Sequence, residues 1–323
     1  VAASDSGGGD VQTYGKRGEH LNDVTMLVHV SGDHKRATVI SFPRDLRVRI
    51  ASCPNDKGGN YPSQTNKLNV SLTYGGLACV VKTVENLTGL DIPYAALTEF
   101  QGVVGMSNAV GGVDVCVATA IHDQQIHVDL EPGTHTLVGE QAVQFLRVRY
   151  GLGDGSDLGR VSNQQLFLSA LVRKIKTPEV LGNPLTVYKL AEAVTANMSM
   201  SNSLKNLSTL ASMAGAVKDI NFADVVFVQY PSASNASGLA PLVGPANVLI
   251  GAIKADKPIA LTGKVSAVGG TELAPGSQPN GAATPGGSGA TTDPATDAVE
   301  LPSVIPGQTA AQETCTRGQR AGG

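Results

Sequence analysis

The chain has 323 residues, of which 16% are charged, and its formal net charge at pH 7 is −3. Proteins that bind a nucleic-acid backbone need a cationic surface, so this balance and the lack of a long basic run exclude that class. No stretch of about 18 consecutive apolar residues occurs, so the printed sequence contains no predicted membrane span.

The first predicted elements are two β-rich runs, Thr25–Val30 and Ala37–Phe42, joined by the turn sequence SGDHKR. Their composition and spacing predict a hairpin. Pro43 ends the second strand because proline has no amide proton for the next ladder bond. The corner then carries Arg44 and Asp45, where a phosphate or metal site could begin. The alternative is a solvated surface ion pair.

Helices and strands alternate through the middle of the chain. Apolar residues recur at helical spacing from Leu77 to Leu87, and Gly89 supplies a stop signal. Further helices are expected over residues 98–109, 138–150, 161–175, 203–217 and 245–255, and strands over 113–118 and 225–230. This order predicts an α/β fold, an α/β/α layered sandwich with a mixed central sheet, over residues 1–265.

The last part of the chain, residues 266–323, is rich in Gly, Pro, Ala, Ser and Thr and poor in large apolar residues. Such a composition buries too little apolar surface to offset the entropy of ordering the chain. We therefore predict a disordered tail here.

Four cysteines occur, and neither their spacing nor the histidines form a zinc pattern. Cys53 follows the first hairpin in a polar loop and Cys79 lies in the next helix, so we expect a disulfide between them. That pairing implies an oxidising, extracytoplasmic compartment. Free thiols in a cytosolic protein are the alternative. Cys116 lies in an apolar strand and is interpreted as a small buried hydrophobe.

Arginine is scarce, so its placement is informative. Arg147 and Arg149 flank Val148 at the end of one helix, and Arg160 opens the next helix with Gln164 on the same face. Together with Arg44 these guanidinium groups would suit a pyrophosphate, whose oxygens they match in pairs. The alternative is that each arginine is a solvated surface residue.

Carboxylates near strand ends suggest a cation site. Asp5 and Asp23 are candidate ligands for a hard divalent cation such as Mg²⁺, or Mn²⁺, which prefers oxygen donors. Lys67 and Asn69 would add donors from a nearby loop. Aspartates beside strands are also common turn formers, which is the competing interpretation.

Taken in order, these segments resemble one family. The relevant motifs are Ser4-Asp5-Ser6, Asn22-Asp23-Val24-Thr25, SFPRD, NKLN before YGG, VGGVDV, L-x-G-x-x-A, Arg147-Val148-Arg149, and DLGR followed by Gln164-Gln165. Over roughly residues 1–175 the sequence resembles the LytR-CpsA-Psr family of extracellular phosphotransferases. Any one motif is common, whereas eight in this order are specific.

The resemblance implies a membrane-anchored enzyme, with its anchor outside the printed chain, that acts on the outer face of the cell membrane or in the cell wall. Such enzymes move a glycopolymer from a polyprenyl-pyrophosphate carrier to the muramic acid 6-hydroxyl of peptidoglycan. Arabinogalactan, teichoic acid and capsule are the candidate polymers. A polyprenyl pyrophosphatase and a non-catalytic scaffold that binds lipid or wall polymer are the alternatives.

The resemblance also implies residue roles. Asp5 and Asp23 would bind the metal, and a second group would bind pyrophosphate: Arg44, Lys67, Arg147, Arg149, Arg160 and Gln164. Arg44, Asp45, Arg147 and Arg149 would carry catalysis, with Asp45 either orienting Arg44 or acting as general base. The apolar helix faces at residues 77–87 and 166–172 would line a lipid tunnel.

Overall fold

The computed structural model of the protein describes residues 2–4, 21–55, 57–277 and 297–319. Its main sheet has seven strands in the order β13-β8-β1-β2-β3-β14-β20. In chain order their bounds are β1 (Ala2–Ser4), β2 (Asn22–Val30), β3 (Ala37–Phe42), β8 (Ala96–Glu99), β13 (Met198–Met200), β14 (Val225–Gln229) and β20 (Gly307–Thr309). β1 runs parallel to β8 and β3 parallel to β14, whereas β2 and β3 form the predicted antiparallel hairpin.

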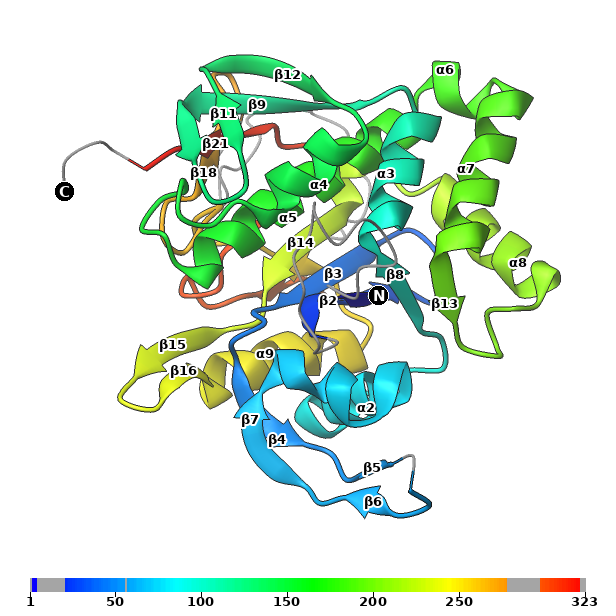
Figure 1. Ribbon diagram of the computed structural model, residues 1–323, viewed down its shortest axis with the longest axis vertical. Helices are drawn as coiled ribbons and strands as arrows, with labels where there is room; N and C mark the ends of the chain where they lie inside the picture. The colour runs from blue at the N-terminus through cyan, green and yellow to red at the C-terminus, as the bar shows by residue number, and fades with distance from the viewer. Residues whose placement is uncertain (1, 5–20, 56, 278–296, 320–323) are drawn as a thin grey trace.

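Helices cover both faces of this sheet (Figure 1). One face carries α2 (Ser71–Thr88) and α9 (Val243–Lys254), and the other carries α3 (Phe100–Ala109), α4 (Glu140–Arg147) and α5 (Asp157–Ile175). Three more helices lie beside the sheet, namely α6 (Pro178–Leu181), α7 (Pro184–Asn197) and α8 (Leu207–Lys218). The predicted α/β/α sandwich with a mixed sheet is therefore confirmed. The sequence prediction did not include α7, which has no buried residue.

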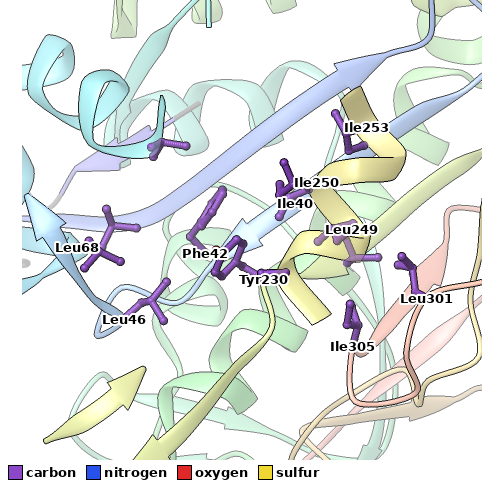
Figure 2. Packing of buried hydrophobic residues seen from close by; sticks show 14 of the residues in the cluster. Ile40, Phe42, Leu46, Leu68, Tyr230, Leu249, Ile250, Ile253, Leu301 and Ile305 are labelled. Carbon is purple, nitrogen blue, oxygen red and sulfur yellow. The ribbon is translucent and has the colours of Figure 1, made fainter. Parts of the chain in front are cut away.

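The two central strands explain why both faces need cover. In β3, Ile40 and Phe42 point into the core beneath α9, whereas Val39 belongs to the cluster on the opposite face. Neighbouring β14 repeats this alternation with Val228 on one side and Phe227 on the other. Figure 2 shows Ile40 against the α9 side chains, with Phe42 next to Tyr230. A strand buried on both faces loses the apolar/polar alternation that marks a half-exposed strand.

A second sheet has four strands in the order β12-β9-β21-β18. Its bounds are β9 (Val113–Thr119), β12 (Gly133–Leu137), β18 (Thr271–Leu273) and β21 (Thr314–Arg317). Short two-stranded pairs complete the fold: β4 (Arg47–Ile50) with β7 (Gln64–Lys67), β5 (Cys53–Pro54) with β6 (Asn60–Tyr61), β10 (Ile121–Asp123) with β11 (Val128–Leu130), β15 (Ser232–Asn235) with β16 (Gly238–Pro241), and β17 (Ile259–Ala260) with β19 (Val299–Glu300).

The prediction of a disordered tail is wrong for residues 266–277 and 297–319. β20 joins the edge of the main sheet beside β14, and β21 lies between β9 and β18 in the second sheet. This segment has few large apolar side chains, but two of them, Leu301 and Ile305, are almost fully buried. Backbone hydrogen bonds in the strand pairs supply the remaining stabilisation. The remaining tail residues, 278–296 and 320–323, lie outside the described part of the chain.

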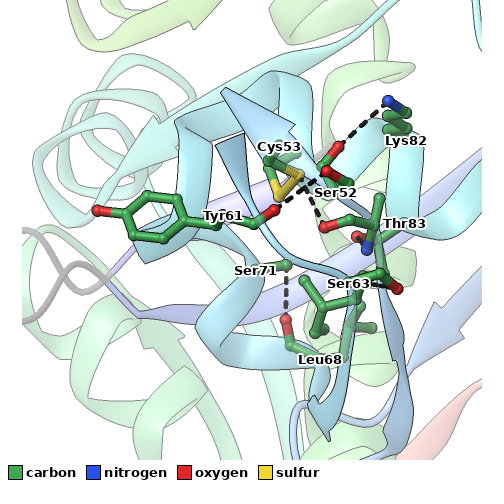
Figure 3. Close-up of a disulfide and its surroundings, with 11 residues drawn as sticks. Ser52, Cys53, Tyr61, Ser63, Leu68, Ser71, Lys82 and Thr83 are labelled. Carbon is green, nitrogen blue, oxygen red and sulfur yellow. Dashed lines mark hydrogen bonds between the residues drawn. A yellow bond between two sulfur atoms is a disulfide. The ribbon is translucent and has the colours of Figure 1, made fainter. Parts of the chain in front are cut away.

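Two disulfides tie the fold together. Cys53 and Cys79 pair as predicted, and this bond, shown in Figure 3, joins β5 to α2. The interpretation of Cys116 as an unpaired hydrophobe is wrong, because it pairs with Cys315 across 199 residues. The composition of the C-terminal segment predicts disorder and therefore gives no signal that Cys315 pairs with Cys116.

Among the residues described here, no helix has the length and apolar character needed to cross a bilayer.

Candidate functional site

The proline corner after β3 gathers three carboxylates around one arginine. The backbone N–H of Arg44 donates to Asp157 Oδ2 at 3.0 Å, and its guanidinium forms a close ion pair with Asp23. Its Nε also lies 3.7 Å from Asp45 Oδ1. Because Pro43 stops the strand, Arg44 leaves the ladder and turns toward acids from β2 and α5.

Electrostatics keeps this arginine charged. Burial by itself lowers the pKa of Arg44, but attraction from Asp23, Asp45 and Asp157 outweighs it, so the pKa lies above its usual value. Only 16% of the side chain is exposed. Arg44 therefore holds Asp23 and Asp45 through its guanidinium and Asp157 through its backbone N–H.

A cavity of about 320 Å³ opens beside this corner, and we call it the charged pocket. One wall carries acids and bases from three distant segments: Asp45, Arg47, Lys67, Arg149, Asp154 and Asp157. The other wall is uncharged and comes from the β15–β16 hairpin and from Val268. Of the residues predicted from the sequence, Asp45, Lys67 and Arg149 line the pocket. Lys67 Nζ lies 3.1 Å from Asp45 Oδ1.

Arg149 is held by the loop that carries it. Its backbone N–H donates to Asp123 Oδ2 at 3.4 Å, and its Nε donates to the Gly155 carbonyl at 3.3 Å. The C-terminal segment braces the same loop, because Gly153 N–H donates to the Arg317 carbonyl at 3.2 Å and Gln319 N–H to the Gly151 carbonyl at 2.8 Å. The segment expected to be disordered thus fixes a predicted site residue.

The other predicted binding residues do not line the charged pocket. Arg160 is buried and forms a close ion pair with Asp157, so it acts on the pocket wall through that carboxylate. Gln164 Nε2 donates to the Leu146 carbonyl at 3.2 Å, which joins α5 to α4. The Arg147 guanidinium lies 5.0 Å from the centre of the Phe100 ring. Their predicted roles toward pyrophosphate stay predictions.

A second cavity, of about 560 Å³, lies on the α2 face of the sheet, and we call it the apolar pocket. Its lining comes from β2, from α2, from the segment before β8 and from α8, and includes Leu77, Val80, Val81, Val84, Met213 and Val217. The expected tunnel wall at residues 77–87 therefore does line a cavity. The other expected wall, at residues 166–172, does not: Leu166 and Leu171 pack into a separate core with α4 and β9.

Strand β2 runs from the Arg44 corner to the apolar pocket. Asp23 near its start pairs with Arg44, and the residues from Thr25 onward line the apolar pocket. Two residues of extended chain span about 7 Å. The Asp23–Arg44 ion pair therefore lies close to the near end of the apolar pocket.

The predicted metal ligands can be examined only in part. Asp5 lies outside the described residues, so its predicted role stays a prediction. Asp23 and Asp45 offer the carboxylate oxygens that Mg²⁺ prefers, and the buried Oδ1 of Asp45 has no aligned hydrogen bond despite the nearby Lys67. The donor types fit a hard divalent cation.

Sequence reasoning missed three residues of the charged wall. Arg47 lies directly opposite Lys67 in the β4–β7 pair, so two cations meet across that ladder. Asp154 follows Arg149 in the same loop, and Asp157 is the first residue of α5. Arg47 could have been found from the alternation in "RDLRVR", which places it on the same face of the chain as Asp45.

Comparison with known proteins identifies the family of this chain. A family model described as the LytR_cpsA_psr family matches residues 7–243. The chain belongs to this family. The solved structure of a LytR-Csp2A-Psr enzyme from Actinomyces oris superposes with a TM-score of 0.60 at 20% identity, over 72% of this chain and 85% of that one. This likeness supports the fold.

Two curated relatives add detail. The cell wall biosynthesis protein LcpA of Corynebacterium glutamicum is 28% identical over 60% of this chain and 42% of its own length. The polyisoprenyl-teichoic acid–peptidoglycan teichoic acid transferase TagT of Bacillus subtilis is 29% identical over 68% of this chain and 66% of its own length. The chain therefore spans less than half of LcpA and about two thirds of TagT.

Proposed function

We propose that this chain is a phosphotransferase that moves a glycopolymer from a polyprenyl-pyrophosphate carrier to the muramic acid 6-hydroxyl of peptidoglycan. The observation that carries the proposal is a charged pocket beside the Arg44 corner together with an apolar pocket that strand β2 reaches from the same corner. The name of TagT, a relative that transfers teichoic acid from a polyisoprenyl carrier to peptidoglycan, supports it.

The reaction needs positioning and charge neutralisation more than covalent chemistry. The acceptor oxygen attacks the polymer-linked phosphorus, the bond from that phosphorus to the bridging oxygen breaks, and polyprenyl phosphate leaves. Arg149 and Lys67 at the charged pocket would hold the phosphate oxygens. Arg44, fixed by its acids, would keep Asp45 in place, and Asp45 would accept the proton of the acceptor hydroxyl.

A divalent cation would assist on the same wall. Asp5 and Asp23 would hold Mg²⁺ or Mn²⁺, which would neutralise charge on the pyrophosphate. The residues themselves bind and orient: Asp23 holds Arg44, and Asp157 holds both the Arg44 backbone and Arg160.

The apolar pocket would hold the lipid. Its walls are side chains such as Leu77, Val81 and Val84, which would shield the first part of a polyprenyl chain from water. The two disulfides fit this function, because disulfides persist in oxidising compartments outside the cytoplasm. We therefore propose that this chain acts at the outer face of the membrane or in the cell wall. Arabinogalactan, teichoic acid and capsule remain the candidate polymers.

The test uses the purified chain with a polyprenyl-pyrophosphate-linked oligosaccharide, a peptidoglycan fragment and Mg²⁺. We expect a phosphodiester-linked product that is lost without the cation and in Asp23→Ala. Release of phosphate with no transfer to the acceptor would instead indicate a polyprenyl pyrophosphatase. Binding of the lipid with neither product would indicate a scaffold and overturn the proposal.

A further inference from the structure

The uncharged wall of the charged pocket is the hairpin β15–β16. Its sequence, SASNASGLAP, contains no acid and no base, and it contributes Ser234, Ser237, Gly238 and Leu239 to the lining. The rest of the lining includes six charged residues, and one of them, Arg47, lies next to the hairpin. The pocket therefore combines charged groups that can hold a phosphate with uncharged groups that can contact a neutral part of the same ligand.

The base of this hairpin is rigidly tied to the proline corner. Tyr230, just before the hairpin, stacks on Phe42 with ring centres 4.9 Å apart. Leu239 forms a bridge with Leu46, which is fully buried. Leu242 N–H donates to the Pro231 carbonyl at 3.0 Å and closes the base.

Gly238 brings the hairpin close to the charged wall. Its φ is +115°, and a Cβ there would lie 3.2 Å from Arg47 Cδ. A larger residue would be strained and would push the arginine stem away. The tip is exposed and shaped by Asn235, whose Oδ1 accepts from Ser237 N–H at 2.8 Å. The serine side chains are therefore presented by a shaped turn on an anchored base.

Resting on the proposed function, we propose that this hairpin binds the sugar ring next to the phosphate that is transferred. Serine hydroxyls both donate and accept hydrogen bonds, as sugar hydroxyls do, and carry no charge that would compete with Lys67 or Arg149 for phosphate. Leu239 and Val268 supply an apolar surface for the C–H face of a ring. A sugar phosphate thus matches both walls.

Two sugars have this chemistry: the first sugar of the polymer and the acceptor sugar of peptidoglycan. The test compares wild type with Ser234→Ala/Ser237→Ala in three assays: cleavage of polyprenyl pyrophosphate without sugar, cleavage of the same lipid carrying an oligosaccharide, and transfer to a peptidoglycan fragment. Ser303→Ala, an exposed serine that does not line the pocket, is the matched control.

Loss of one or two hydrogen bonds predicts a rise in KM of about tenfold for the sugar that the hairpin contacts. A rise for the sugar-bearing lipid relative to the sugar-free lipid assigns the hairpin to the polymer, and a rise for the acceptor alone assigns it to peptidoglycan. Unchanged KM values, or equal effects on the sugar-free lipid, overturn the inference. A wild-type chain inactive in all three assays refutes the proposed function instead.

Discussion

The two pockets are built in opposite ways. The apolar pocket is lined mainly by β2, α2 and α8, whereas the charged pocket takes its lining from the proline corner, the β4–β7 pair, the loop that leads into α5, a hairpin and Val268. An apolar wall tolerates exchange of similar side chains, because burial of apolar area is non-directional. A charged wall depends on each atom's position, so we expect it to be the more easily damaged.

The largest expected effect comes from the disulfide that joins β9 to β21 in the second sheet. Cys116→Ser/Cys315→Ser opens a loop with a sequence separation of 199, and the chain-entropy model predicts a loss of about 5 kcal/mol in the free energy of unfolding. Cys53→Ser/Cys79→Ser, with a separation of 26, should lose about 3.5 kcal/mol. Urea unfolding measures both, and equal losses would contradict the loop-length argument.

Replacement of one arginine of the charged pocket should have the second-largest effect. Arg149→Ala deletes a guanidinium from the charged pocket, and we expect turnover with the polyprenyl-pyrophosphate substrate to fall about 100-fold. The unfolding midpoint should hardly move, because the side chain makes one backbone hydrogen bond. Arg49→Ala is the matched control, since Arg49 bonds to Ser63 and does not line the pocket. Equal losses in both variants would argue against the site.

A charge in the apolar pocket should have a smaller and more selective effect. Val81→Asp places a carboxylate in the pocket wall and should raise KM for a long polyprenyl pyrophosphate at least tenfold. A short-chain pyrophosphate that does not reach this wall should be affected less. Val248→Asp, at an exposed position on α9, is the control. Identical KM values for the long lipid in both variants would show that the tail binds elsewhere.

The smallest effect is a pH dependence at the wall of the apolar pocket. Burial lowers the pKa of His29, against attraction from Asp256. The unfolded chain then binds the proton more tightly, so the free energy of unfolding falls as the pH drops below about 6.5 and levels off below the folded-state pKa. Solvent screening limits this to a few tenths of a kcal/mol. Urea midpoints between pH 7.5 and 5 should show a slope that His29→Gln reduces, and an unaltered slope would contradict it.

Local patterns carried much of the prediction. The β2–β3 hairpin, the α2 face at Leu77 to Val84 and the Cys53–Cys79 bond all follow from residues close in sequence. The motif order also pointed to the correct family. The helix face at 166–172 was misplaced because periodicity shows that a face is buried and not which core it joins.

The sequence by itself determined the α/β/α class and the family, and it supplied the residue types that we propose for a pyrophosphate site, because periodicity, turn chemistry and motif order are local properties. Only the tertiary structure decided that Asp45, Lys67 and Arg149 share a pocket while Arg147 and Gln164 do not line it. It alone paired Cys116 with Cys315 and placed the C-terminal strands in both sheets. Long-range pairing depends on backbone hydrogen bonds and shape, which composition does not encode.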